Sequence, residues 1–140
     1  MWKTFDKDAN GYVPGEGIGV LLLQPLEQAL TDGNQIYAML KGSAVNHGGR
    51  ALSLTAPRVE AQRDVLLQAY EDADINPETI TYLEAHGTGA SLGDPIEVEA
   101  VTQAFRCYTG SKEFCRIGSV KTNIGHLEAA AGIAGPSKSC

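Results

Sequence analysis

A continuous apolar run at residues 18–23 is the sequence feature that most constrains the fold. It lies between a glycine-rich stretch and Pro25, and its side chains do not alternate between apolar and polar. Such a run is typical of a strand buried on both faces in the centre of a sheet. Residues 36–40, with an extension to Val45, predict a second strand, and residues 80–83 and 116–120 predict two more.

Helical patterns alternate with these strands. Residues 26–30, followed by Asp32 and Gly33, predict a short helix. Residues 46–50 predict a loop. Thr55 and Pro57 open a longer helix, which Asn76-Pro77 ends. Its apolar positions follow helical spacing at Val59, Leu66, Tyr70 and Ala73.

A third helix has a clear start signal. Asp94 is the predicted N-cap, Pro95 suits the first helical position, and Glu97 completes a capping box. Its apolar stripe consists of Val98, Val101, Ala104 and Phe105. After His126, small residues as far as Gly135 predict a last helix that is buried on most sides. Strands that alternate with helices indicate an α/β layered fold.

Composition sets the class of protein. The chain has 140 residues, of which 43% are hydrophobic and 20% charged, as expected for one soluble globular domain. Its formal net charge of -6 argues against an electrostatic nucleic-acid binder. No apolar run approaches the roughly 20 residues of a membrane helix. The first residues lack the apolar core of a signal peptide, so we expect a cytoplasmic protein.

The three cysteines are Cys107, Cys115 and Cys140. Their number is odd, none is part of a C-x-x-C pair, and no histidine lies at metal-ligand spacing from them. We therefore expect no structural zinc site. Cys107 ends a helical stretch and Cys115 lies beside charged residues, so neither is predicted to be a nucleophile.

Two further patterns are misleading. Residues 6–13 match the first eight positions of a calcium-binding EF-hand loop, but the twelfth position is Gly17 instead of glutamate. No helix pattern precedes the loop, so we interpret it as an Asx-rich turn that leads into a strand. The glycines at residues 15–19 precede a strand, whereas a dinucleotide loop must follow one, so no dinucleotide cofactor is expected.

Two histidines lie in glycine-flanked turns that follow predicted strands. His86 follows a predicted strand in the stretch Glu-Ala-His-Gly-Thr-Gly, and His126 follows another in Lys-Thr-Asn-Ile-Gly-His. The carboxyl ends of strands are where sites collect in α/β sheets. Glycines beside each histidine allow a substrate to approach the backbone closely. Together with Lys121, the two histidines are predicted to form one enzyme active site.

Several long motifs in the same order also resemble a known family. They are residues 5–17, 84–89, 93–97 and 118–132. The chain resembles the second half of a β-ketoacyl synthase, and it is most similar to ketosynthase domains of bacterial modular polyketide synthases. Residues 46–57 are most similar to assembly lines with separate acyltransferases. The resemblance implies a thiolase-like fold with α/β/α/β/α layers, of which residues 1–135 are the C-terminal region. Residues 136–140 form an atypical tail, in which Pro136 is expected to end the last helix.

The resemblance implies a decarboxylative Claisen condensation. A cysteine takes up an acyl chain, and a malonyl group on a carrier protein loses carbon dioxide and attacks it. His86 and His126 would donate hydrogen bonds to the malonyl thioester oxygen, while Lys121 would orient the site and pair with Glu128. The implied substrate contacts are Thr88, Gly87 and Asn123, with structural support from Glu128 and Asp94. Substrates would arrive on phosphopantetheine, without a metal or other cofactor.

The resemblance also implies partners. They are an acyl carrier protein, the remainder of the ketosynthase domain and, because complete members are homodimers, a second copy. The nucleophilic cysteine belongs to an earlier motif that this sequence does not contain, so we expect the chain alone to be inactive and poorly soluble. Ala90 replaces the usual threonine or serine. The tail suggests a frameshift, a truncated gene or a cloning scar, and Met1 suggests an internal start. An alternative is a non-catalytic partner that docks on a ketosynthase or a carrier protein, although the acidic charge disfavours carrier docking.

Overall fold

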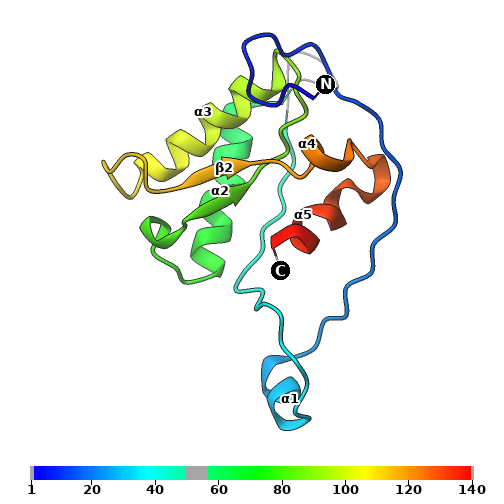
Figure 1. Ribbon diagram of the computed structural model, residues 1–140. Helices are drawn as coiled ribbons and strands as arrows, with labels where there is room; N and C mark the ends of the chain where they lie inside the picture. The colour runs from blue at the N-terminus through cyan, green and yellow to red at the C-terminus, as the bar shows by residue number, and fades with distance from the viewer. Residues whose placement is uncertain (1, 50–56, 140) are drawn as a thin grey trace.

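The computed structural model describes residues 2–49 and 57–139. Figure 1 shows a pair of short strands with helices on both sides. The elements in chain order are α1 (Leu26–Thr31), α2 (Val59–Asp72), the 3-10 helix η1 (Pro77–Thr79), β1 (Tyr82–Glu84), α3 (Gly93–Arg106), β2 (Arg116–Gly118), α4 (Lys121–Ile124), the 3-10 helix η2 (Glu128–Ala130) and α5 (Ala131–Ser139). No helix in the described ranges is long and apolar enough to cross a bilayer.

The two strands form a parallel pair that α3 connects. Tyr82 lies opposite Arg116, and Glu84 lies opposite Gly118. Beyond the last pair, the Ala85 N–H donates to the Gly118 carbonyl at 2.8 Å. The strands predicted at residues 80–83 and 116–120 are therefore confirmed, with bounds shifted by one to two residues. Parallel pairing places both carboxyl ends, and so both histidine turns, at the same edge.

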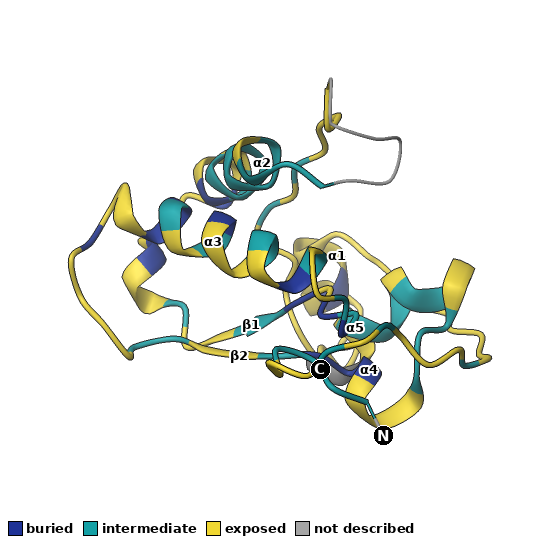
Figure 2. Ribbon diagram, turned by 90° about the horizontal axis from the view of Figure 1, so that it is seen from above, coloured by how far each residue is buried: buried dark blue, intermediate teal, exposed yellow. Residues whose placement is uncertain are grey.

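The core lies where α2 packs on α3, as Figure 2 shows from above. Tyr70 of α2 and Phe105 of α3 are buried, with ring centroids 6.0 Å apart, and Phe114 packs edge-on to Phe105 at 5.1 Å. Both helices are amphipathic and bury most of the stripe that the sequence predicts, although Val98 is 40% exposed. The predicted helices at residues 26–30 and after Pro57 are confirmed, whereas Thr55 lies outside the described residues.

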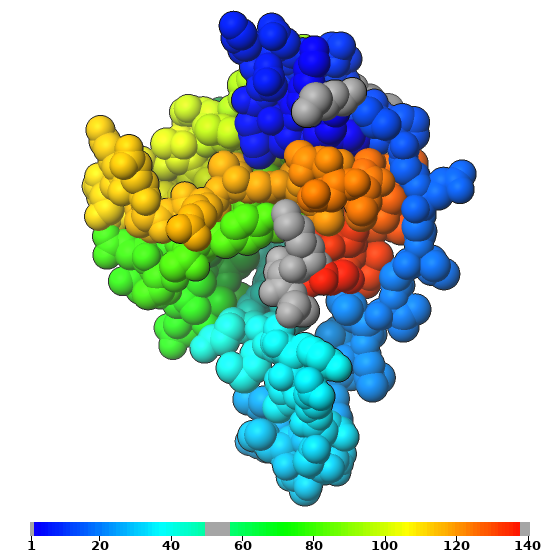
Figure 3. Space-filling view, in the orientation of Figure 1, coloured from blue at the N-terminus to red at the C-terminus, as the bar shows by residue number. Residues whose placement is uncertain are grey.

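The strands predicted at residues 18–23 and 36–40 are wrong. Both segments are extended, but β1 and β2 form the one sheet within the described residues. Their apolar side chains face solvent, with Ile18 93% and Leu22 94% exposed. In Figure 3 the blue part of this segment runs along the outside of the molecule, and its cyan part projects from the rest. The apolar pattern predicts burial, but a strand also needs a neighbouring strand to bond its backbone.

Three further expectations for the helices are wrong. Leu92, not Asp94, is the N-cap of α3, and no side chain caps it. The predicted helix after His126 is divided into η2 and α5, and its residues are half-buried or exposed. Pro136 lies inside α5 instead of ending it. A proline normally clashes with the Cβ of the preceding residue, but Gly135 has no Cβ, so the helix continues.

Candidate active site

The two histidine turns meet at the carboxyl edge of the strand pair. His86 follows β1 by two residues, and His126 follows β2 by way of α4. Their ring centroids are 5.5 Å apart, and the rings are nearly perpendicular at 89°. The fold therefore brings together the two side chains that the sequence assigns to one site. At this separation the rings pack edge to face, so one small group beside the pair can lie within reach of N–H groups from both.

The backbone of the His86 turn is held by carboxylates of α3. Glu97 accepts a hydrogen bond from the His86 N–H at 2.6 Å and one from the Gly87 N–H at 2.9 Å. Asp94 is buried and accepts from the Gly89 N–H with both oxygens at 3.1 Å. These carboxylates therefore support the neighbouring turn instead of capping their own helix. Charge-assisted bonds of this kind fix a loop more firmly than neutral ones.

Residues 6–13, which resemble an EF-hand loop, are hydrogen-bonded to both histidine turns. The Asp8 N–H donates to Asp6 at 2.8 Å, which forms the predicted Asx turn. Gly11 donates to the Gly89 carbonyl at 2.9 Å, and His126 donates to the Val13 carbonyl at 2.9 Å. Sequence reasoning missed this function, because no local pattern shows which distant carbonyls these backbone groups meet.

The tautomer of His126 follows from its surroundings. The Glu128 N–H donates to His126 Nδ1 at 3.0 Å, so in the neutral ring the hydrogen lies on Nε2. The Tyr12 ring packs against the imidazole with centroids 5.1 Å apart. A hydrogen bond with the Glu128 carboxylate raises the pKa of the Tyr12 hydroxyl. His126 therefore has a fixed ring whose Nε2–H donor bonds no other described residue.

Lys121 is the buried cation of the site, with 5% of its surface exposed. Burial lowers the pKa of its ammonium, while the carboxylates of Glu97 and Glu84 act in the opposite direction. The expected partner, Glu128, is not among these carboxylates, and it bonds Tyr12 instead. The pKa of His86 is lowered mainly by burial and then by the charge of Lys121. Both effects favour the neutral form of the His86 imidazole.

The expected substrate contacts occupy different environments. Thr88 lines a cavity of about 470 Å³ beside His86, together with Ala90. Gly87 is buried below it, and its carbonyl accepts from the Thr4 hydroxyl at 2.7 Å. Asn123 lies on α4 and is exposed. Of these three, Thr88 is the one whose side chain can contact a ligand in the cavity.

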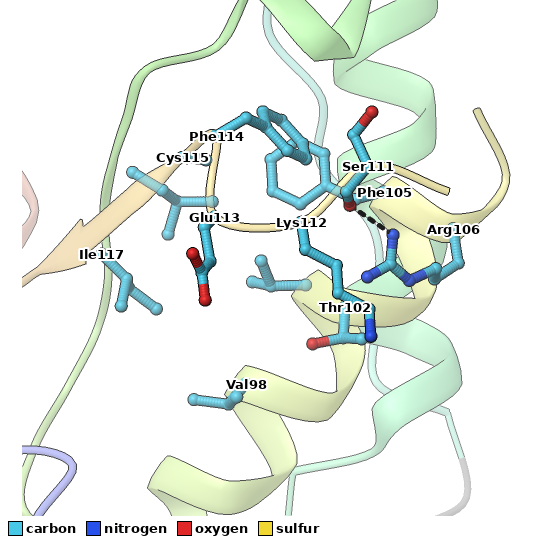
Figure 4. A pocket seen from close by; sticks show the side chains of 12 residues that line it. Val98, Thr102, Phe105, Arg106, Ser111, Lys112, Glu113, Phe114, Cys115 and Ile117 are labelled. Atoms are coloured by element: carbon cyan, nitrogen blue, oxygen red, sulfur yellow. Dashed lines mark hydrogen bonds between the residues drawn. The ribbon is translucent and has the colours of Figure 1, made fainter. Parts of the chain in front are cut away.

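A second hollow lies at the other end of α3 (Figure 4). Phe105 and Cys115 are among its lining residues, and a bond from Arg106 to the Ser111 carbonyl at 2.7 Å crosses its rim. Neither His86 nor His126 lines it. Cys115 faces this hollow and Cys107 is exposed, so neither cysteine lines the cavity beside His86.

Comparison with known proteins agrees with the fold. The sequence profile of the β-ketoacyl synthase C-terminal domain matches residues 37–140, and that of the N-terminal domain matches residues 1–29. The chain belongs to the β-ketoacyl synthase family, whose thiolase-like α/β fold it shares.

The similar proteins are polyketide synthases. Polyketide synthase PksL of Bacillus subtilis is 57% identical over 97% of this chain, which corresponds to 3% of that protein. The ketosynthase from module 6 of the bacillaene synthase of the same species is 49% identical. It matches with a TM-score of 0.95 over 97% of this chain and 24% of its own length. An oxazolomycin ketosynthase domain of Streptomyces albus is 42% identical, with a TM-score of 0.94, and 24% of it is covered. The chain thus spans about a quarter of the solved ketosynthases.

Proposed function

We propose that this chain supplies the decarboxylation half of a ketosynthase active site in polyketide chain elongation. The observation that carries the proposal is the perpendicular histidine pair, with 5.5 Å between ring centroids, beside a buried lysine. The substrates are a malonyl group and an acyl chain, each bound as a thioester to the phosphopantetheine of a carrier protein. The nucleophilic cysteine comes from the remainder of the domain. Neither a metal nor another cofactor takes part.

The histidines act on the malonyl thioester. Its carboxylate leaves as carbon dioxide, and the electron pair of the broken carbon–carbon bond moves onto the thioester oxygen as an enolate. The Nε2–H of His126 and an N–H of neutral His86 donate to that oxygen as its charge develops. One such donor typically lowers the barrier by about 3 to 4 kcal/mol. The enolate carbon then attacks the acyl thioester, and the cysteine leaves as a thiolate.

The proposal predicts the effect of removing either histidine. The test uses a complete domain in which this chain replaces the matching quarter of the bacillaene module 6 ketosynthase. His86→Ala and His126→Ala should each slow decarboxylation of malonyl-carrier protein on the order of 10²- to 10³-fold, because each removes one donor to the enolate. His47→Ala is the control, since His47 is exposed and bonds only Gly49 among the described residues. Histidine variants with the rate of the parent would overturn the proposal.

The 140-residue chain by itself should form no acyl-enzyme. Of the cysteines among the described residues, Cys107 is exposed and Cys115 faces the second hollow, away from the cavity beside His86. The measurement is intact-protein mass spectrometry after incubation with a labelled acyl-carrier thioester. The parent bacillaene domain serves as the positive control. A stable, stoichiometric adduct on this chain would show that the nucleophile assignment is wrong.

A further inference from the structure

Glu84 occupies the junction between the two histidine turns, yet the proposed reaction gives it no role. It is the last residue of β1 and lies opposite Gly118 of β2. One carboxylate oxygen accepts from the backbone N–H of Val120, beyond the end of the ladder. The other accepts from the Tyr82 hydroxyl at 2.5 Å. A Cβ built on Gly135 would lie 3.3 Å from Glu84 Cγ, so α5 packs directly against this side chain.

The bond to Val120 fixes the start of α4. This helix has four residues, and Lys121 is the first of them. A helix this short cannot hold its own position in water, so contacts outside it determine where Lys121 lies. Val120 and Lys121 are both buried, and Ser119 links the turn to the His86 carbonyl at 3.3 Å. Glu84 therefore anchors Lys121 to β1, the strand that carries His86.

The negative charge of Glu84 also favours the protonated form of Lys121. A buried ammonium loses hydration and needs nearby negative charge to stay protonated. Two carboxylates act on it in this way, Glu97 from α3 and Glu84 from β1. The charge of Lys121 in turn lowers the pKa of the neighbouring His86. Glu84 thus combines a hydrogen bond to the lysine turn with a charge that favours the lysine cation.

We propose that Glu84 is a positioning residue that holds the Val120–Lys121 turn beside His86, with its own carboxylate next to the lysine. Its consequence for catalysis rests on the proposed function, whereas its effect on Lys121 does not. Glu84 acts through Lys121 and not on the substrate.

The direct test measures Lys121 by NMR in the full 140-residue chain. Glu84→Gln keeps a carbonyl oxygen for the Val120 N–H but removes the charge, so the pKa of Lys121 should fall further below its usual range. Glu128→Gln is the matched control and should leave the pKa of Lys121 unchanged, because that carboxylate bonds Tyr12. An unchanged titration of Lys121 in Glu84→Gln, or an equal fall in Glu128→Gln, would overturn the proposal.

The second test uses the complete domain with this chain in place. Glu84→Gln should move the alkaline limb of the pH–rate profile to lower pH, with little change in KM. Glu84→Ala, which also frees the lysine turn, should lower kcat by on the order of 10²-fold. Glu99→Gln is the control, since exposed Glu99 bonds Gln103 on the outer side of α3.

The two proposals fail in different ways. If His86→Ala and His126→Ala remain active, the proposed function is wrong, but the Lys121 titration still decides the role of Glu84. If the histidine variants lose activity while both Glu84 variants match the parent in kcat and pH profile, the catalytic role of Glu84 is wrong. If Glu84→Ala fails to fold, both measurements are made on Glu84→Gln, whose amide oxygen can still accept from the Val120 N–H.

Discussion

A side-chain carboxylate holds the turn of His86, and a backbone N–H holds the ring of His126. The His86 turn depends on Glu97, which accepts two of its N–H groups, whereas the ring of His126 is fixed by the Glu128 N–H. Gly87 lies at the tightest point of the first turn, with φ +47. A Cβ there would lie 2.7 Å from Thr4 Cγ2 and 2.8 Å from Ser119 Cβ. Glycine is therefore required by conformation and by space.

Gly87→Ala is expected to destabilise the fold by about 1–3 kcal/mol, because alanine is strained at positive φ and collides with two neighbours. The measurement is the free energy of unfolding in urea. Gly132→Ala is the matched control. Gly132 lies in α5 with nothing within 4 Å of its would-be Cβ, so alanine should be neutral or stabilise by about 0.5–1 kcal/mol. Equal effects of the two substitutions would contradict this account.

Among the elements, α2 and α3 form the strongest contact, and one atom at their interface is unpaired. Tyr70 is 7% exposed, and its hydroxyl finds no hydrogen-bond partner among the described residues. Burial raises the pKa of this hydroxyl to about 12. The Tyr70 ring stabilises the core by packing against Phe105 and Tyr108, whereas its buried, unpaired hydroxyl lowers the stability of the fold.

Tyr70→Phe should therefore raise the free energy of unfolding by up to about 1–3 kcal/mol, because it removes a buried polar group without a partner. It should also change the pH dependence. The folded-state pKa of about 12 lies above the ordinary value of 10.0, so the unfolded chain loses its proton first. Stability is then lost as pH rises from 10 to 12, and Tyr70→Phe should lose less.

Urea unfolding at pH 8, 10 and 11.5 measures both effects, with Tyr37→Phe as the control because Tyr37 is 76% exposed. A Tyr70→Phe variant that is less stable than the parent at pH 8 would mean that the hydroxyl has a partner.

At the scale of the whole molecule, the apolar side chains of residues 18–23 and 36–40 are the dominant surface feature. Ile18, Val20 and Leu22 are each at least 88% exposed, and α1 adds Leu30 at 64%. Extended segments with unpaired backbone and exposed apolar side chains are sites of association. The chain covers about a quarter of a solved ketosynthase, in which further chain is present.

The 140-residue chain should therefore self-associate or need a partner. Leu22→Lys should shift sedimentation toward the monomer, because a charge disfavours edge-to-edge pairing. Glu99→Gln changes the net charge by the same amount on α3, away from these segments, and should leave association unchanged. A dilute monomer with a sharp cooperative melt would contradict the prediction.

The sequence by itself determined the amphipathic helices, the two strands β1 and β2 and the two histidine turns. Each depends on local spacing, glycine placement or side-chain type, which are read directly along the chain. Tertiary structure decided the partners: Glu97 binds the His86 turn instead of capping its helix, and Glu84 and Glu97, not Glu128, act on Lys121. It also decided that residues 18–23 form no ladder with another described segment. The reason is physical, since the partner of a hydrogen bond or a charge depends on which distant atoms lie within reach, and local spacing carries no record of them.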